Sequence, residues 1–489
     1  MAHGGGKSAA ATHEFAWLVA GVEKAAWAAG ARRTTSTTAT VVVPARPRAA
    51  TRATLRFHRA TQPPLGDQRP AVDWWSPRPP ELTLNALTPD AAAALGGPDW
   101  LRARRRAAAE RFVASGLPSA AEEVWRYSRV EEIELDGFML AGPDGAGPAP
   151  TAVVPTVVLV DGHLRSADAP AGVEIVPLAE AKGGEEALGG VLGDAPDAFA
   201  ELNTAFAPDP LLIRVAPGTV VDRPIVVHVH AATPGAVTFP RLVVEIGADA
   251  QATVAEVQTS VPGAALVAAV TEISVGDAAR ARHVTVQELD PSTWQVATQV
   301  SRVGQSADFL AAGAALGGAY ARLRTDCRLV GRGASGTLLA AYLGDGDQML
   351  DFRTFQDHAA PDTTSELLFK GALADHSRSV YTGLIRVRPN ARGTVAFQTN
   401  RNLKLSEHAW AESVPNLEIE NNDVKCSHAS AVGPVDPEQR FYLESRGVPT
   451  DEAEKLIVAG FFDDVLARFP DQAVADQVRA EIAGTLEHT

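Results

Sequence analysis

The sequence predicts a mainly β protein: a right-handed β-helix (β-solenoid) core flanked by small N-terminal and C-terminal helical regions. Short runs of alternating β-branched residues, broken by Gly, Pro and Asp, extend from about residue 156 to residue 430. These runs reach small turn residues at a nearly constant interval. Helix-capping patterns precede and follow them. Aromatic residues make up only 6% of the chain, which suits a narrow solenoid interior.

The repeat is the strongest of these signals. Its turn residues lie 27 to 32 positions apart, an interval typical of stacked coils that each bury an inner face against their neighbours. The turn residues are Ala250, Ala278, Ala307, Ala334, Asp362, Ala391 and Asp423. A β-sandwich is the alternative, because it also consists of short alternating strands separated by turns.

We divide the chain into four parts: an N-terminal extension (1–80), a helical region with its linker (81–150), the β-helix core (151–433) and a C-terminal helical region (434–489). The extension is compositionally distinct, since residues 24–66 contain eight basic residues and no Asp or Glu. Such a segment is typical of a disordered arm or of sequence upstream of the true start. A plastid transit peptide is the alternative.

Both helical regions carry recognisable helix starts. Thr88 is expected to cap a helix that has Pro89 in its first turn. Asp436 and Pro437 repeat this pattern after the core, and Thr450 is expected to cap a second C-terminal helix.

Composition excludes several functional classes. The net charge of −15 argues against non-specific nucleic-acid binding. Two cysteines exclude a disulfide framework and favour a reducing cytoplasm. The sequence contains no run of about 20 apolar residues, so it predicts no membrane span. G-x-S-x-G, H-E-x-x-H and C-x-x-C motifs are all missing from the sequence, and the glycines at 331–336 precede a strand-like run rather than a helix. We therefore expect no catalytic site of a standard nucleotide-binding or hydrolase type.

One thiol and one imidazole occur close together near the end of the core. Cys426 and His428 are two residues apart, so in a strand they face the same side. A thiolate with an imidazole suits iron or zinc, although this spacing alone is also common in structural positions. His408, one coil earlier, is a tentative third ligand. Cys327 lies in an alternating strand and is expected to be a buried small residue.

The second C-terminal helix has a broad apolar stripe. Ile457, Phe461 and Val465 recur at helical spacing, which predicts either a docking surface or a face that packs back on the β-body.

Several stretches resemble the SufB/SufD family of iron–sulfur cluster assembly proteins, and in particular its SufD branch. These motifs occur in order from the N-terminal helical region to the C-terminus, and their residue patterns are specific. They are EEVWRYSRVEEIEL (122–135), LLFKGAL (367–373), QTNRNLKLSEHA (398–409), PNLEIENNDVKCSHASAVG (415–433), FYLESRG (441–447) and EAEKLIVAGFFDDVL (452–466). One departure is Ala429, where the family usually has Gly.

The resemblance implies a non-enzymatic subunit with a β-helix core. It would pair with a SufB-like paralogue through the β-helix and bind a separate SufC-type ABC ATPase through its C-terminal helices. Cys426 and His428 would contribute to a nascent cluster or iron site shared with SufB, with reduced flavin in some complexes and no cofactor held tightly by this chain alone. Phe441 and Tyr442 would join the helix stripe in binding the ATPase.

Two other functions stay open on the sequence. One is a SufB-like scaffold that carries its own cluster. The other is a β-helix binding or structural module without a metal role.

Overall fold

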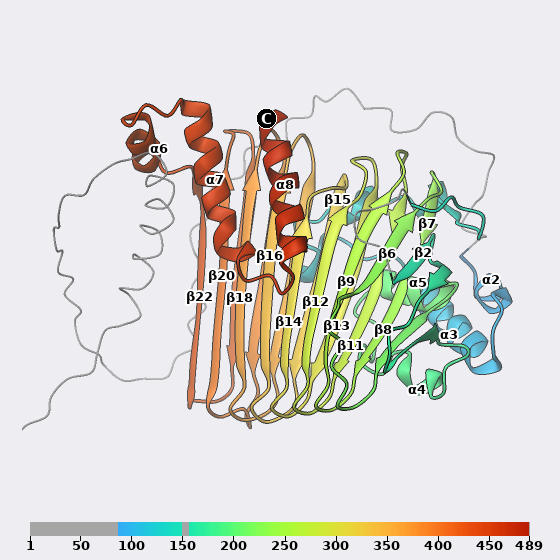
Figure 1. The fold of residues 1–489 in the computed structure, drawn as a ribbon. Helices are drawn as coiled ribbons and strands as arrows, with labels where there is room; N and C mark the ends of the chain where they lie inside the picture. The colour runs from blue at the N-terminus through green and yellow to red at the C-terminus, as the bar shows by residue number, and fades with distance from the viewer. Residues whose placement is uncertain (1–86, 149–155, 489) are drawn as a thin grey trace, which may run out of the picture. The chain divides into compact units, whose positions relative to one another are not determined.

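The computed structural model describes residues 87–148 and 156–488, so the predicted extension over residues 1–80 lies outside the described residues. Two long sheets of mostly parallel strands face each other, and from β11 onward the chain passes from one to the other and back (Figure 1). This is a β-solenoid of about eight turns, which confirms the fold class and excludes the β-sandwich.

Sheet A contains strands in the order β21-β19-β17-β15-β13-β11-β8-β5-β4, with β1, β7 and β10 beside this path. Neighbouring strands are parallel, except that β4 and β5 are antiparallel. The bounds are β1 (Met139–Leu140), β4 (Val173–Pro177), β5 (Leu211–Val215), β7 (Ala236–Thr238), β8 (Arg241–Ile246), β10 (Leu266–Val267), β11 (Val270–Val275), β13 (Trp294–Val303), β15 (Tyr320–Leu329), β17 (Met349–His358), β19 (Arg378–Val387) and β21 (Trp410–Ile419).

Sheet B has the order β22-β20-β18-β16-β14-β12-β9-β6-β2-β3 and is also parallel, apart from the antiparallel pair β2 and β3. Its strands are β2 (Val157–Val160), β3 (His163–Ala167), β6 (Ile225–Ala231), β9 (Gln251–Ser260), β12 (Arg280–Glu288), β14 (Asp308–Ala315), β16 (Ser335–Gly344), β18 (Thr364–Leu373), β20 (Thr394–Lys404) and β22 (Val424–Pro434).

The repeat has its physical origin in one kind of turn. A residue with left-handed backbone lies in each turn from sheet A to sheet B between β5 and β20, and its N–H donates to a carbonyl of the next turn. Asp249 donates to Asp277 at 2.9 Å and Asp362 donates to Arg392 at 2.8 Å. Stacked turns thus satisfy their own backbone groups, and this fixes the coil length. The left-handed residues are Gly218, Asp249, Ala278, Ser306, Gly333, Asp362 and Gly393.

The N-terminal helical region covers one end of the solenoid. Its elements are α2 (Pro89–Ala94), α3 (Asp99–Ser115) and the 3₁₀ turns η2 (Glu123–Trp125), η3 (Val130–Glu132) and η4 (Leu135–Gly137). Thr88 caps α2 as expected, because its hydroxyl accepts from the N–H of Ala91 at 3.1 Å. Trp125 is buried and joins this region to the core cluster.

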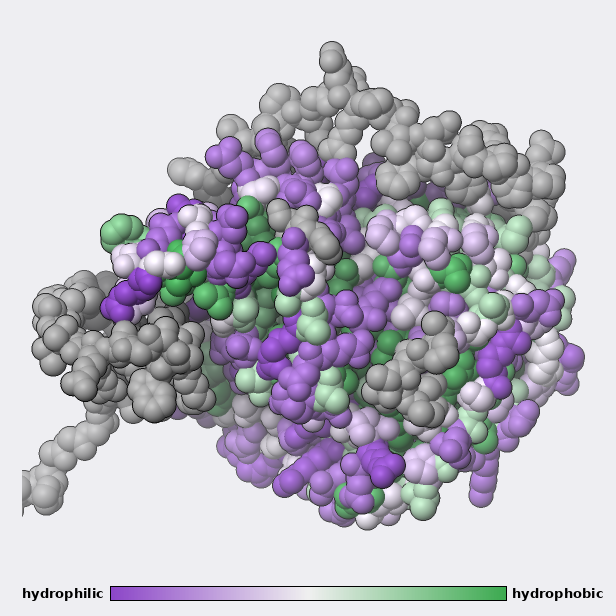
Figure 2. Space-filling view, turned by 45° about the horizontal axis from the view of Figure 1, so that its top comes forward, coloured by the Kyte–Doolittle hydropathy of each residue, from purple (hydrophilic) through white to green (hydrophobic). Residues whose placement is uncertain are grey.

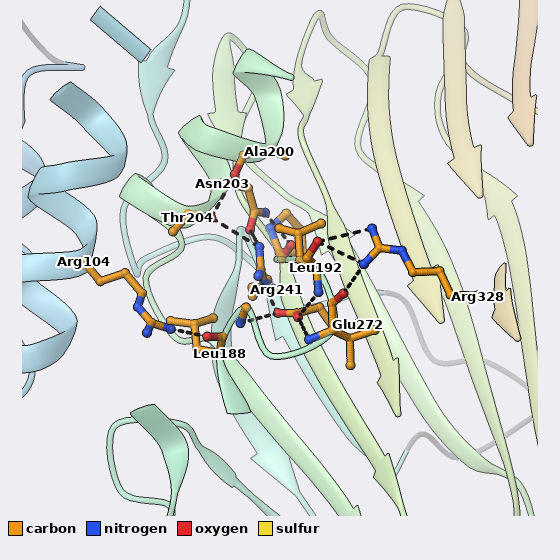
Figure 3. A network of polar contacts seen from close by, with 12 residues as sticks. Arg104, Leu188, Leu192, Ala200, Asn203, Thr204, Arg241, Glu272 and Arg328 are labelled. Atoms are coloured by element: carbon orange, nitrogen blue, oxygen red, sulfur yellow. Dashed lines mark hydrogen bonds and ion pairs between the residues drawn. The ribbon is translucent and has the colours of Figure 1, made fainter. Parts of the chain in front are cut away.

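The span 151–433 contains two helices as well as strands. Helices α4 (Gly184–Ala187) and α5 (Ala198–Phe206) interrupt it between β4 and β5. A buried ion pair anchors this insertion to sheet A: Arg241 contacts Glu272 at 2.5 Å, and the Glu272 carboxylate also accepts backbone N–H groups of the segment before α5 (Figure 3). Asn203 of α5 accepts from the same guanidinium at 3.2 Å.

Three helices follow the core: α6 (Pro437–Glu444), α7 (Thr450–Leu466) and α8 (Gln472–His488). Asp436 caps α6 as expected, accepting from Glu438 at 2.9 Å. Thr450 is not the cap of α7, a correction, because the cap position is Pro449 and the Thr450 hydroxyl donates to Glu444 instead. Helices α7 and α8 lie along the outer face of sheet B (Figure 1). Among the helices of the described part, none is long and apolar enough to cross a membrane.

Candidate functional site

The candidate site lies on the last coil of the solenoid. Strand β22 is the outermost strand of sheet B, and β21 is the outermost strand of sheet A. Within the described residues, each of them has a ladder partner on one side only, β20 and β19 respectively. The last coil therefore offers unpaired backbone N–H and C=O groups along two strands, and we call this end the open end of the solenoid.

Cys426 points into the interior at the open end. It pairs in register with Ala396 and packs, half-buried, against a small cluster that includes Ile385 and Val387 of sheet A. Burial raises the pKa of the Cys426 thiol, and a hydrogen bond from the backbone of Ala396 acts in the opposite direction. The side chain is consequently a protonated thiol at neutral pH, and a metal ion would have to displace its proton.

His428 lies two residues further along β22 and is exposed. Its register partner is Gln398, so His428 and Cys426 belong to the same face of the sheet, above Gln398 and Ala396. The two side chains thus lie together at the edge of the interior on the last coil, which we call the mouth. This pair supplies one sulfur and one nitrogen donor.

His408 is not part of this pair, which corrects the tentative third ligand. It follows the end of β20 at Lys404, whereas Cys426 pairs with Ala396 near the start of that strand. Ala396 and Lys404 are eight residues apart along β20, which corresponds to about 26 Å. His408 and Cys426 therefore lie toward opposite ends of this strand. His408 instead stacks on His376, with ring centroids 4.9 Å apart and planes 11° apart.

The donor set at the open end is incomplete. Within residues 87–148 and 156–488, no group of three or more His, Cys, Asp or Glu side chains could hold a metal ion. Cys327 does not add a ligand, because it is buried in the interior and burial raises its pKa to about 12. A cluster or iron ion bound by Cys426 and His428 would need further ligands from outside the described chain.

The expected ATPase-binding residues divide into two groups. Phe441 and Tyr442 are 70% and 41% exposed, and hydrophobic side chains show at the surface near the C-terminal helices in Figure 2. Val465 is fully buried and packs against the outer face of sheet B, so it does not present a docking surface. Ile457 and Phe461 are half-buried.

Sequence reasoning missed the amides behind the mouth. Gln398, Asn400 and Asn402 alternate along β20 and are all buried in the interior. Alternating polar residues ordinarily indicate a solvent face, and this is why the pattern gave no signal. Asn400 and Asn402 form a closed set of hydrogen bonds with the hydroxyl of Tyr342, at 2.7 to 3.0 Å.

Comparisons with known proteins agree with this architecture. Residues 228–461 match the family model described as the SUF system FeS cluster assembly, SufBD core domain. The chain is 33% identical over 381 residues to the iron-sulfur cluster assembly SufBD family protein Rv1462 of Mycobacterium tuberculosis, covering 76% of this chain and 90% of that protein.

Two further relatives extend the comparison. The iron-sulfur cluster assembly protein SufD of Escherichia coli is 27% identical over 391 residues, covering 77% of this chain and 90% of that protein. Protein ABCI7, chloroplastic, of Arabidopsis thaliana is 27% identical over 305 residues, covering 60% of this chain and 64% of that protein. Together with the solenoid fold, these matches show that the chain belongs to the SufB/SufD family of iron–sulfur cluster assembly proteins and is SufD-like.

Proposed function

We propose that this chain is the SufD-like subunit of an assembly complex. In this proposal it pairs with a SufB-like paralogue through the open end of the solenoid and binds a SufC-type ABC ATPase through its C-terminal helices. The observation that carries the proposal is the incomplete donor set of Cys426 and His428 on an outermost strand. Two donors beside an unpaired strand edge suit a site that a second subunit completes.

The open end has the chemistry of an interface. Its backbone groups are available for strand addition, and several hydrophobic side chains there are partly exposed. Trp410 and Ile419 of β21 are 36% and 42% exposed, and Val432 of β22 is 43% exposed. A paralogue with its own solenoid could extend either sheet and cover these side chains.

The C-terminal helices supply the second surface. Phe441 and Tyr442 on α6 and Leu456 on α7 are exposed hydrophobic residues. Ile457, which follows Leu456 in the sequence, is half-buried. Exposed aromatic side chains are typical of binding surfaces. In this proposal they contact the ATPase, while the chain itself has no catalytic role and works in the cytoplasm.

The cargo is a transient cluster or iron ion shared with the paralogue, and reduced flavin would belong to the complex rather than to this chain. Cys426 would bind as thiolate after losing its proton to solvent, and His428 would bind through a neutral ring nitrogen. The raised pKa of Cys426 favours the protonated thiol in the free chain, so metal binding is expected to strengthen with rising pH.

The test is anaerobic co-expression with SufB-like and SufC-type partners. We expect a stable complex that acquires iron and sulfide. Cys426→Ala with His428→Ala should lower cluster content at least about tenfold while the complex still forms. Cys327→Ala is the matched control, because it removes a thiol from the buried interior instead of the mouth.

Unchanged cluster content in the Cys426→Ala, His428→Ala complex would contradict the site assignment. Failure of the three chains to copurify would contradict the partner assignment. A stoichiometric cluster on the isolated chain would instead favour a SufB-like scaffold.

A further inference from the structure

Gln398 is a buried amide without a partner. Its side chain is 1% exposed, and neither its nitrogen nor its oxygen has a hydrogen bond within the described part of the chain. Leaving both ends of a buried amide unpaired is destabilising, and native proteins rarely tolerate it without a functional reason. The position of this amide, directly behind the mouth, is therefore informative.

The neighbouring groups are already engaged. Asn400 and Asn402 are closed into their hydrogen-bond set with Tyr342, and the hydroxyl of Tyr381 is 2.9 Å from that of Thr354. Gly383 faces Gln398 and has no side chain, and a Cβ there would come within 2.5 Å of the Gln398 nitrogen. Glycine at this position thus accommodates the amide where it lies. The hydroxyl of Tyr381, which also lies close to Gly383, is already paired with Thr354.

His428 is the polar side chain next to Gln398 in register on the adjacent strand. Register neighbours lie about 4.8 Å apart at Cα and share a face, which is within hydrogen-bonding reach of a Gln and a His. The same chain shows a longer reach on its interior face. There His283 of β12 contacts Glu256 of β9 at 2.8 Å, although the register partner of His283 is Val254. His428 is exposed, so its ring is not packed into the interior.

We propose that Gln398 is the positioning residue of His428. Its Oε1 accepts a hydrogen bond from one ring N–H, which selects one tautomer and leaves the lone pair of the other ring nitrogen facing the mouth. Metal-binding histidines ordinarily hold their second ring nitrogen in this way. The hydrogen bond stands on geometry alone, and its consequence for iron binding rests on the proposed function.

The test uses the full chain with ¹⁵N-labelled histidine at pH 8, above the usual histidine pKa of about 6.5. We expect the His428 ring nitrogens of the unmodified chain to give two well-separated resonances, one protonated and one not. In Gln398→Leu they should move toward a common average, because the two tautomers then exchange freely. His428→Ala assigns the signals.

Gln356→Leu is the matched control. Gln356 is also buried with both amide ends unpaired, but it lies on β17 of sheet A and has no register contact with β22. Its replacement should leave the His428 signals in place. Identical His428 signals in the unmodified chain and in Gln398→Leu would overturn the proposal, as would an equal change in Gln356→Leu. If Gln398 instead bonds to Tyr381, the His428 signals should be identical in the unmodified chain and in Gln398→Leu.

A second measurement separates this proposal from the function. In the co-expressed complex, Gln398→Leu should lower iron content about 10- to 100-fold, while Gln398→Glu, which keeps an acceptor at that place, should retain it. Loss in both variants would show a role in folding only and overturn the positioning role. If the complex never acquires iron, the proposed function fails, and the histidine spectra still decide the hydrogen bond.

Discussion

At the scale of single residues, the interior of this solenoid controls ionisation mainly through burial. His358 shows this clearly, because its ring is fully buried and lies 2.8 Å from the hydroxyl of Thr363 and 2.9 Å from that of Ser365. Burial lowers the pKa of His358 to about 4. The imidazole is therefore neutral in the folded chain at every pH at which the protein is expected to work.

This lowered pKa predicts a loss of stability in mild acid. The unfolded chain binds a proton at His358 near pH 6.5 and the folded chain only near pH 4, so its contribution is complete above 6.5 and is lost as the pH falls toward 4. The difference is about 3 kcal/mol. We expect urea midpoints to fall from pH 7 to pH 5, and less steeply in His358→Gln.

His376→Gln is the control for that experiment, since it replaces a histidine that lies exposed at the surface. The lowered pKa values of His228 and His230 act in the same direction, so some slope should remain in His358→Gln. An identical slope in His358→Gln and the unmodified chain would contradict the prediction.

At the scale of elements, α7 serves two surfaces at once. Val465, Phe462 and Leu466 are buried against sheet B. Lys370 of β18 secures the contact, since its Nζ donates to the carbonyl of Phe461 at 3.0 Å and lies 2.5 Å from Asp464. The helix is thus part of the fold, and only its far side and α6 remain for a partner.

Matched truncations should separate these surfaces. Val465→Ala is expected to destabilise the chain by about 2 kcal/mol, because it leaves a cavity under α7. Phe441→Ala should leave the unfolding midpoint within experimental error and weaken binding of the SufC-type ATPase. Chemical denaturation and copurification measure the two effects. Equal loss of stability in both variants would show that α6 also belongs to the folded core.

At the scale of the whole molecule, the two ends of the solenoid are built differently. Helical elements and the antiparallel strands β3 and β4 border its first coils, whereas β21 and β22 end the two sheets. Antiparallel edge strands bordered by helices hinder the addition of a further parallel strand, whereas the free edges of β21 and β22 permit it. The asymmetry is what makes one end the expected interface.

A charge at the open end should therefore affect assembly without affecting folding. Val432→Lys is expected to weaken association with the SufB-like paralogue at least about tenfold, because a buried unpaired ammonium costs more than the 1.4 kcal/mol which that factor represents. Analytical ultracentrifugation of the mixed subunits measures it. Val113→Lys on α3, where the native valine is 63% exposed, is the control and should associate normally.

The sequence by itself determined the solenoid and its coil length, because the turn that repeats is a local structure with local residue preferences. It also placed Cys426 and His428 on one strand, since alternation along a strand is local. It did not reveal α5 (Ala198–Phe206), because this short helix is almost entirely buried and only Glu201 and Thr204 mark its polar side.

Only the tertiary structure decided three points about the site. It separated His408 from Cys426, because residues close in sequence across a turn can lie at opposite ends of long strands. It buried Val465, because which side of an amphipathic helix faces inward depends on the sheet it meets. It also brought Gln398 beneath His428, 30 positions later in the chain, because register between coils is fixed by the stacked turns and not by either strand alone.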